Sequence, residues 1–205
     1  MVRCSLFALA LLGALGLAGV ARAEGPAAEL GAAVEGGAAF GLAQATYRSS
    51  DSPARPESED ERTRWGLAGA LELTGTFAVA GPVRLGGLLR LELADAPAGP
   101  FVSGSDLLFS FGVGPALRVE SEGDVRWFFG AWLGLASTPS VGGVGVGGGA
   151  EVGVRGFVSP ELALGLGAGV STRWVFYAED GDRGRYDFTQ GAIVPGLRVR
   201  VDVAL

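Results

Sequence analysis

The feature that most constrains this chain is an alternation of apolar and polar residues with a period of two, which begins near Leu30. It is clearest in residues 197–205, where Leu or Val at the odd positions alternates with Arg198, Arg200, Asp202 and Ala204. Successive side chains of a β-strand point to opposite faces, so this pattern predicts strands with one apolar and one charged face. No convincing 3.6-residue stripe follows residue 23, and we therefore predict an all-β fold.

Eight segments carry the alternation, and each has about the ten residues that a tilted strand needs to cross a bilayer. They are residues 29–47, 64–79, 83–94, 106–119, 125–136, 144–158, 162–177 and 186–204. Apolar positions keep the same parity across the short turns at 80–82, 120–124 and 159–161, as antiparallel hairpins require. The other connections are longer, at 48–63, 95–105, 137–143 and 178–185.

The first 23 residues predict a secretory signal peptide. Arg3 supplies a basic start, residues 5–20 form an apolar core, and Ala21-Arg22-Ala23 is a small-x-small cleavage site. An N-terminal membrane anchor is the alternative, but the uncharged run is short for the ~20 residues of a membrane helix. The predicted organisation is therefore a signal peptide at 1–23 and one barrel domain at 24–205.

Composition excludes several classes of function. The chain contains no His, and its one Cys, Cys4, lies in the predicted signal peptide. A Ser-His-Asp or Cys-His catalytic arrangement is therefore excluded, and we predict no enzymatic activity, no cofactor and no metal site. The net charge is −6 without any basic cluster, which excludes nucleic acid as a partner.

Aromatic residues collect near the ends of the predicted strands, in two girdles of the kind that mark the two interfaces of a membrane. Short turns that alternate with long loops, together with the signal peptide, also favour a membrane barrel whose apolar face points outward. The girdle on the long-loop side consists of Tyr47, Trp65, Phe109, Phe111, Trp174, Phe176, Tyr186 and Phe188, and that on the short-turn side of Phe77, Trp127 and Phe129.

With these features the mature chain resembles the small eight-stranded outer-membrane barrels, the family that includes the transmembrane domain of outer membrane protein A and its adhesin-like relatives. The resemblance implies an antiparallel up-and-down transmembrane β-barrel in the outer membrane of a Gram-negative-type bacterium, with both termini on the periplasmic side. It also implies contact with lipid and lipopolysaccharide, and insertion by the barrel-assembly machinery as a monomer. One departure is Leu205, because the family usually ends on an aromatic residue that this machinery reads.

Parity places the charged side chains of the strands inside the barrel. Eight strands leave an interior only wide enough for side chains, so we expect a buried ion network that plugs the lumen. The alternative is a narrow anion-preferring pore, because arginine outnumbers acid there eight to five. The predicted lumen residues are Glu35, Glu72, Arg84, Arg90, Glu92, Arg118, Arg126, Glu151, Arg155, Arg173, Arg198, Arg200 and Asp202.

Glycines crowd the two segments 144–158 and 162–177, where parity places most of them on the inner face. We expect them to make room for bulky lumen residues, Phe128 and Trp132 among them, on strands across the barrel, and any cavity to lie against this wall. The acidic run 57–61 is predicted to be a solvated loop tip, with binding of divalent cations as the alternative.

We predict a structural or surface-interaction role, carried by the four long connections at the cell surface. A further alternative is a periplasmic, lipocalin-like barrel that holds an apolar ligand. That alternative requires the apolar residues to face inward.

A membrane barrel predicts heat-modifiable migration. Unboiled protein is expected to migrate differently from boiled protein in a denaturing gel, and to give a β-rich circular dichroism spectrum in detergent. A chain that stays monomeric and soluble without detergent would contradict the prediction.

Overall fold

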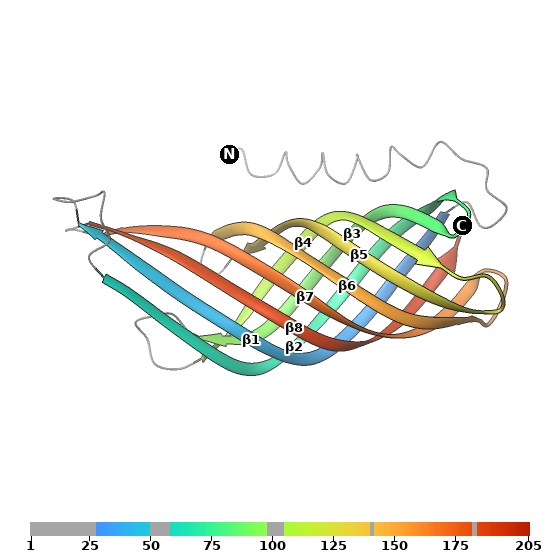
Figure 1. The fold of residues 1–205 in the computed structure, drawn as a ribbon, viewed down its shortest axis with the longest axis horizontal. Coiled ribbons are helices and arrows are strands. Elements are labelled where there is room, and N and C mark those ends of the chain that lie inside the picture. Colours follow the sequence, from blue (N-terminus) through green and yellow to red (C-terminus); the bar gives the residue numbers. More distant parts are fainter. Residues whose placement is uncertain (1–27, 50–57, 98–104, 140–141, 182–183) are drawn as a thin grey trace.

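The structure is a computed structural model that describes residues 28–49, 58–97, 105–139, 142–181 and 184–205 (Figure 1). These residues form one closed antiparallel barrel of eight strands, in which each strand pairs with its neighbours in sequence and the last strand pairs with the first. The predicted fold class is confirmed. The predicted signal peptide at 1–23 lies outside the described residues.

The strands agree closely with the alternating segments of the sequence. They are β1 (Ala28–Ser49), β2 (Ser58–Ala80), β3 (Val83–Pro97), β4 (Ser105–Glu120), β5 (Val125–Thr138), β6 (Gly143–Phe157), β7 (Leu162–Gly181) and β8 (Gly184–Ala204). Two of the predicted long connections, 48–63 and 178–185, are shorter than expected because the flanking strands continue as paired hairpins.

The prediction that the acidic run 57–61 forms a loop tip is wrong for the residues of it that the structure describes. The backbone of residues 59–61 lies in β2 and pairs with residues 44–46 of β1. Glu57 lies outside the described residues. The acidic run therefore belongs largely to a strand.

Four contiguous strands project beyond the rest of the barrel. In the described ladders, β2 pairs with β1 from Ser58 but with β3 only from Ala68. Similarly, β7 pairs with β8 as far as Gly181 but with β6 only as far as Phe176. The order β7-β8-β1-β2 thus forms a projecting sheet, seen at the left of Figure 1.

An exposed ion cluster lies on this projecting sheet. Arg185 donates a hydrogen bond to Asp187 at 2.9 Å, and Arg48 donates one at 3.1 Å. These contacts, with that of Arg185 the stronger, hold the pKa of Asp187 below its ordinary value. All three side chains are at least one-third exposed, so the cluster contributes little to stability.

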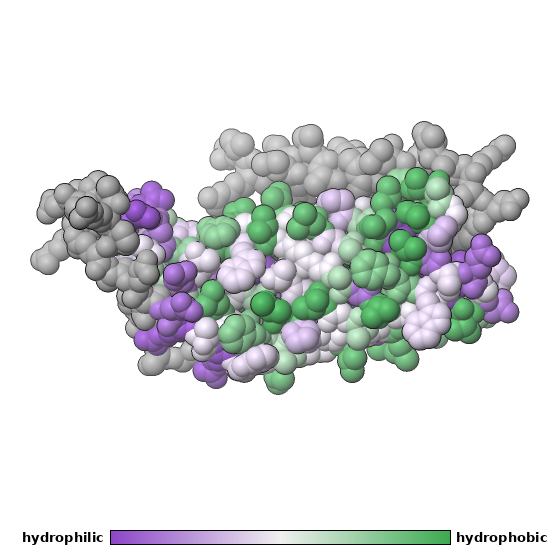
Figure 2. Space-filling model, viewed as in Figure 1, coloured by the Kyte–Doolittle hydropathy of each residue, from purple (hydrophilic) through white to green (hydrophobic). Residues whose placement is uncertain are grey.

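The barrel is apolar outside and charged inside. The outward residues Leu67 and Leu197 are 77% and 72% exposed, whereas the inward Arg155 is 1% exposed. Figure 2 shows apolar residues spread over the middle of the wall and hydrophilic residues gathered at its two ends. This inverted arrangement is that of a transmembrane β-barrel. The lipocalin-like alternative is wrong, because it requires the apolar residues to face inward.

In the described residues, no helix is long and apolar enough to cross a membrane.

Most of the predicted girdle residues lie on the outer face. Trp65 packs against Phe40 there, with ring centroids 5.0 Å apart. Three predicted girdle residues face inward instead, in the projecting sheet: Tyr47 packs against Tyr186, and Phe188 stacks on Tyr177. Parity explains the difference, because these three continue the inward series that contains Ala45 and Gln190, both buried. The outward residues are Trp65, Phe77, Phe109, Phe111, Trp127, Phe129, Trp174 and Phe176.

The inner glycines of β6 make room for two bulky residues of the adjacent strand. Gly149 pairs directly with Trp132 of β5, and Gly153 pairs with Phe128. A Cβ at Gly149 would lie 2.7 Å from Trp132 Nε1, and one at Gly153 would lie 2.6 Å from Phe128 Cζ. The rings therefore come from the neighbouring strand and not from across the barrel.

A methyl group at Gly153 is expected to destabilise the barrel. We predict that Gly153→Ala lowers the free energy of unfolding by about 1–3 kcal/mol, because the methyl would clash with the backbone oxygen of Leu166 and lie 2.6 Å from Phe128 Cζ. The matched control on β6 is Gly156→Ala, whose Cβ would meet nothing within 4 Å. The control is expected to change stability by less than about 0.5 kcal/mol in urea unfolding from detergent micelles. Equal effects at the two sites would contradict the packing account.

Candidate functional site

The predicted lumen residues are brought together in the barrel interior. All of them are buried except Arg126, whose side chain is 30% exposed at the short-turn end, beside the ring of Phe157. Because inward and outward positions alternate along each strand, every second residue contributes to one continuous column of side chains. The column divides into three groups, described here from the short-turn end to the loop end.

Arg155 is the centre of the group at the short-turn end. Its two terminal nitrogens donate to both carboxylate oxygens of Glu29, at 2.9 and 3.1 Å, in a bidentate pair. The same guanidinium contacts Glu120 and Asp202, the latter at 3.4 Å. Arg118 reaches the same three carboxylates at 3.4–3.7 Å. Three acids and their arginines thus share one set of contacts.

The middle group surrounds three glutamates. Arg198 contacts Glu35, and it also donates to Glu151 at 2.9 Å and to Glu72 at 3.2 Å. Arg90 binds Glu35 from the other side in a bidentate pair at 2.9 and 3.1 Å. Arg90 of β3 thus reaches Glu35 of β1, and Arg198 of β8 reaches both Glu72 of β2 and Glu151 of β6, so these ion pairs join strands that are not neighbours in the sheet.

The third group lies nearest the loop end. Arg90 donates to Glu92 at 3.0 Å and to the Ser171 hydroxyl at 2.9 Å. Arg173 donates to the other oxygen of Glu92 at 2.8 Å and contacts Ser110. Arg90 belongs to this group and to the middle group, while Arg200 links the middle group to Asp202 at 2.7 Å. The whole column is one connected network.

The buried charges of the described lumen balance. Sequence parity counted eight arginines and five acids, but two more acids, Glu29 and Glu120, are also buried there, and Arg126 lies at the rim. Glu29 lies at the start of β1, and Glu120 is the last residue of β4. Glu29 has the parity of Glu35 and Glu120 that of Arg118, so parity could have identified both acids as lumen residues. The seven buried arginines are Arg84, Arg90, Arg118, Arg155, Arg173, Arg198 and Arg200, and the seven acids are Glu29, Glu35, Glu72, Glu92, Glu120, Glu151 and Asp202.

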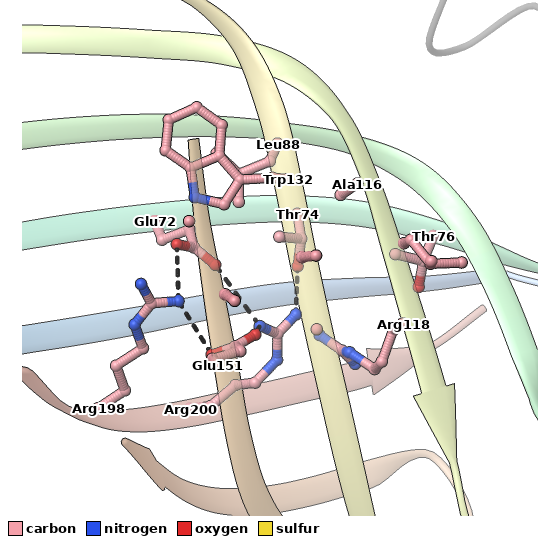
Figure 3. Close-up of a pocket in the computed structure, with 15 residues that line it drawn as sticks. Glu72, Thr74, Thr76, Leu88, Ala116, Arg118, Trp132, Glu151, Arg198 and Arg200 are labelled. Carbon is pink, nitrogen blue, oxygen red and sulfur yellow. Dashed lines mark hydrogen bonds and ion pairs between the residues drawn. The ribbon is translucent and has the colours of Figure 1, made fainter. Parts of the chain in front are cut away.

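Two small cavities lie within the column and Trp132 lines both of them; Figure 3 shows the first. Each has a volume of about 20 Å³, which is room for about one water molecule. Gly149 and Ala150 of the glycine-rich strand line the first cavity. Neither cavity has room for a hydrated ion.

The side chains of the network pair with one another as ions and fill the lumen of the barrel. Guanidinium groups face the buried carboxylates within ion-pair distance, so these acids serve as counter-charges. Among the described residues, no group of three or more acidic side chains is placed to hold a metal ion. The arrangement favours a closed, rigid interior.

Removal of Arg155 is expected to leave three buried carboxylates short of a partner. We predict that Arg155→Gln lowers the free energy of unfolding by about 3–5 kcal/mol. The control is Arg126→Gln at the rim, where the single ion-pair contact is 3.8 Å long, and a change below about 1 kcal/mol is expected. Urea unfolding in detergent measures both variants. A loss at Arg155 no larger than that at Arg126 would contradict the network's structural role.

No protein-family model matches the sequence, and no curated protein matches it. Among solved structures, the chain is similar to Neisserial surface protein A, with 16% identity, coverage of 85% of this chain and 97% of that chain, and a TM-score of 0.42. It is also similar to the outer membrane protein OprG from Pseudomonas aeruginosa, with 11% identity, coverage of 86% of this chain and 97% of that chain, and a TM-score of 0.47. A third similar structure is the outer membrane enzyme PagL, with 13% identity, coverage of 78% of this chain and 97% of that chain, and a TM-score of 0.36. These are likenesses of general fold, and the predicted eight-stranded barrel is confirmed by the strand order of the chain itself.

Proposed function

We propose that this chain is an integral outer-membrane protein whose barrel is closed and non-catalytic, and whose projecting sheet and surface loops carry an interaction at the cell surface. The observation that supports this most is the balanced ion network, which fills the lumen with paired side chains. A barrel filled in this way provides a rigid base, and among the described residues the projecting sheet extends past its rim.

The outer membrane is the proposed location because the wall is a band of exposed apolar side chains. Such a band requires lipid around it, and a β-barrel satisfies its own backbone hydrogen bonds within that lipid. Lipid and lipopolysaccharide are therefore the proposed surroundings, and the barrel-assembly machinery the proposed route of insertion. The predicted signal peptide supplies export from the cytoplasm.

The proposed lack of catalysis rests on residue types and on pairing. The chain offers no His, and the buried carboxylates that the structure describes are engaged in ion pairs with arginines. The anion pore is the second candidate, because arginines line both internal cavities, although the carboxylates that pair with them line these cavities too.

Planar-bilayer recording separates the closed barrel from the pore. Purified protein whose insertion is verified by heat-modifiable migration is expected to give no conductance steps above the bare bilayer at any voltage. Steps that carry anions in preference to cations, and that lose this preference in Arg198→Gln, would overturn the closed barrel and favour the pore.

Surface labelling tests the orientation. Ala178 lies in the projecting sheet and Glu122 in a short turn, and both are exposed. The variant Ala178→Cys is expected to react with a membrane-impermeant maleimide on intact cells, while Glu122→Cys reacts only after the cells are lysed. The reverse pattern would place the projecting sheet in the periplasm and contradict a role at the cell surface.

A further inference from the structure

Two buried polar atoms that face the cavity between β5 and β2 make no hydrogen bond to protein. They are Nε1 of Trp132 and Oε1 of Glu72. Both residues line the same cavity of about 20 Å³, and Figure 3 shows the indole nitrogen on the side of its ring that faces Glu72. Buried polar groups are nearly always hydrogen-bonded, so these two atoms together indicate a ligand.

The chemistry of the two atoms selects the ligand. Trp132 Nε1 is a donor and needs an acceptor, whereas a carboxylate oxygen of Glu72 needs a donor. An anion accepts from the indole but cannot donate to Glu72, and a cation cannot accept from the indole. A neutral molecule that both donates and accepts satisfies the pair, and the volume admits one molecule of water.

The other charged groups of the cavity wall contact one another, although Arg198 Nη2, like the two atoms above, makes no hydrogen bond. The other oxygen of Glu72 accepts from Arg198 at 3.2 Å, and Arg198 also donates to Glu151 at 2.9 Å. Arg200 donates to Glu151 at 3.4 Å and contacts Thr74, and its Nη1 lies 3.7 Å from Glu72 Oε1, an ion-pair distance too long for a hydrogen bond. A water molecule therefore gives Trp132 Nε1 and Glu72 Oε1 hydrogen-bond partners without adding a charge to a balanced network.

We propose that this cavity is a binding site for one structural water molecule, which accepts a hydrogen bond from Trp132 Nε1 and donates one to Glu72 Oε1. The site goes beyond the proposed function and does not depend on it. Through the water, the indole joins the ion network. Gly112 and Gly147 hold its far edge, since a Cβ at either glycine would lie 3.1 Å from Trp132 Cη2.

Water-to-indole magnetisation transfer tests the site directly. Protein labelled with ¹⁵N-tryptophan in detergent micelles contains four indole N–H resonances, and loss of one in Trp132→Phe assigns Trp132. Should that variant fail to insert, Phe substitutions at the other three tryptophans assign it by elimination. The Trp132 resonance is expected to show a nuclear Overhauser cross-peak to water with the sign of a long-lived bound molecule. Absence of this cross-peak overturns the proposal.

A pair of cavity-filling variants locates the water. Ala116 lines the Trp132–Glu72 cavity, and Ala136 lines the second cavity. In a heat-modifiable barrel, Ala116→Val is expected to abolish the Trp132 cross-peak and to shift its N–H resonance, whereas Ala136→Val leaves both unchanged. A cross-peak that persists in Ala116→Val, or that is lost only in Ala136→Val, overturns the assignment.

Discussion

The structure depends on the pairing of guanidinium and carboxylate groups inside a narrow barrel. A charge removed from water costs several kcal/mol unless a partner and hydrogen bonds compensate it. Here Arg155 shares Glu29, Glu120 and Asp202, and Arg198 shares three glutamates, so that no buried acid depends on one arginine alone. Arginine suits this role because its planar fork binds two carboxylate oxygens at once.

The apolar wall and the charged lumen are two consequences of the same alternation. A strand that directs leucine and valine toward lipid must direct every other residue inward, and eight strands bring these inward residues into contact. The barrel then has space for large residues only where a neighbour is small. Gly149 and Gly153 provide that space beside Trp132 and Phe128, which is why the glycines concentrate on the inner face of β6.

The sequence predicted the parts of the fold that follow from periodicity. Strand number, the antiparallel hairpins and the inward face of Arg198, Arg200 and Asp202 come from counting by two, whereas closure into a barrel was implied by the family resemblance. The predicted strand boundaries are wrong where the apolar alternation stops, which is at the ends of the strands. Glu120 was assigned to a turn, and the hairpins of the projecting sheet were assigned to loops because their residues are polar.

Other features depend on register, which alternation does not specify. The inward positions of Tyr47, Tyr186 and Phe188 are an exception, because parity with Glu35 and Arg198 already gives them and the girdle assignment did not apply it. The pairing of Trp132 with Gly149 depends on which residues of β5 and β6 face each other. Contacts across the lumen, such as Arg90 with Glu35, depend in addition on the stagger of the closed barrel.

The most direct test of the central claim is a double-mutant cycle on Arg90 and Glu35, which form a buried bidentate pair. We predict that Arg90→Met and Glu35→Leu each lower the free energy of unfolding strongly. The loss in the double variant is expected to be smaller than the sum of the two single losses by about 2–3 kcal/mol. The exposed pair Arg185 and Asp187 serves as the control, with a coupling below about 1 kcal/mol. A coupling at Arg90 and Glu35 no larger than that of the control would contradict the account.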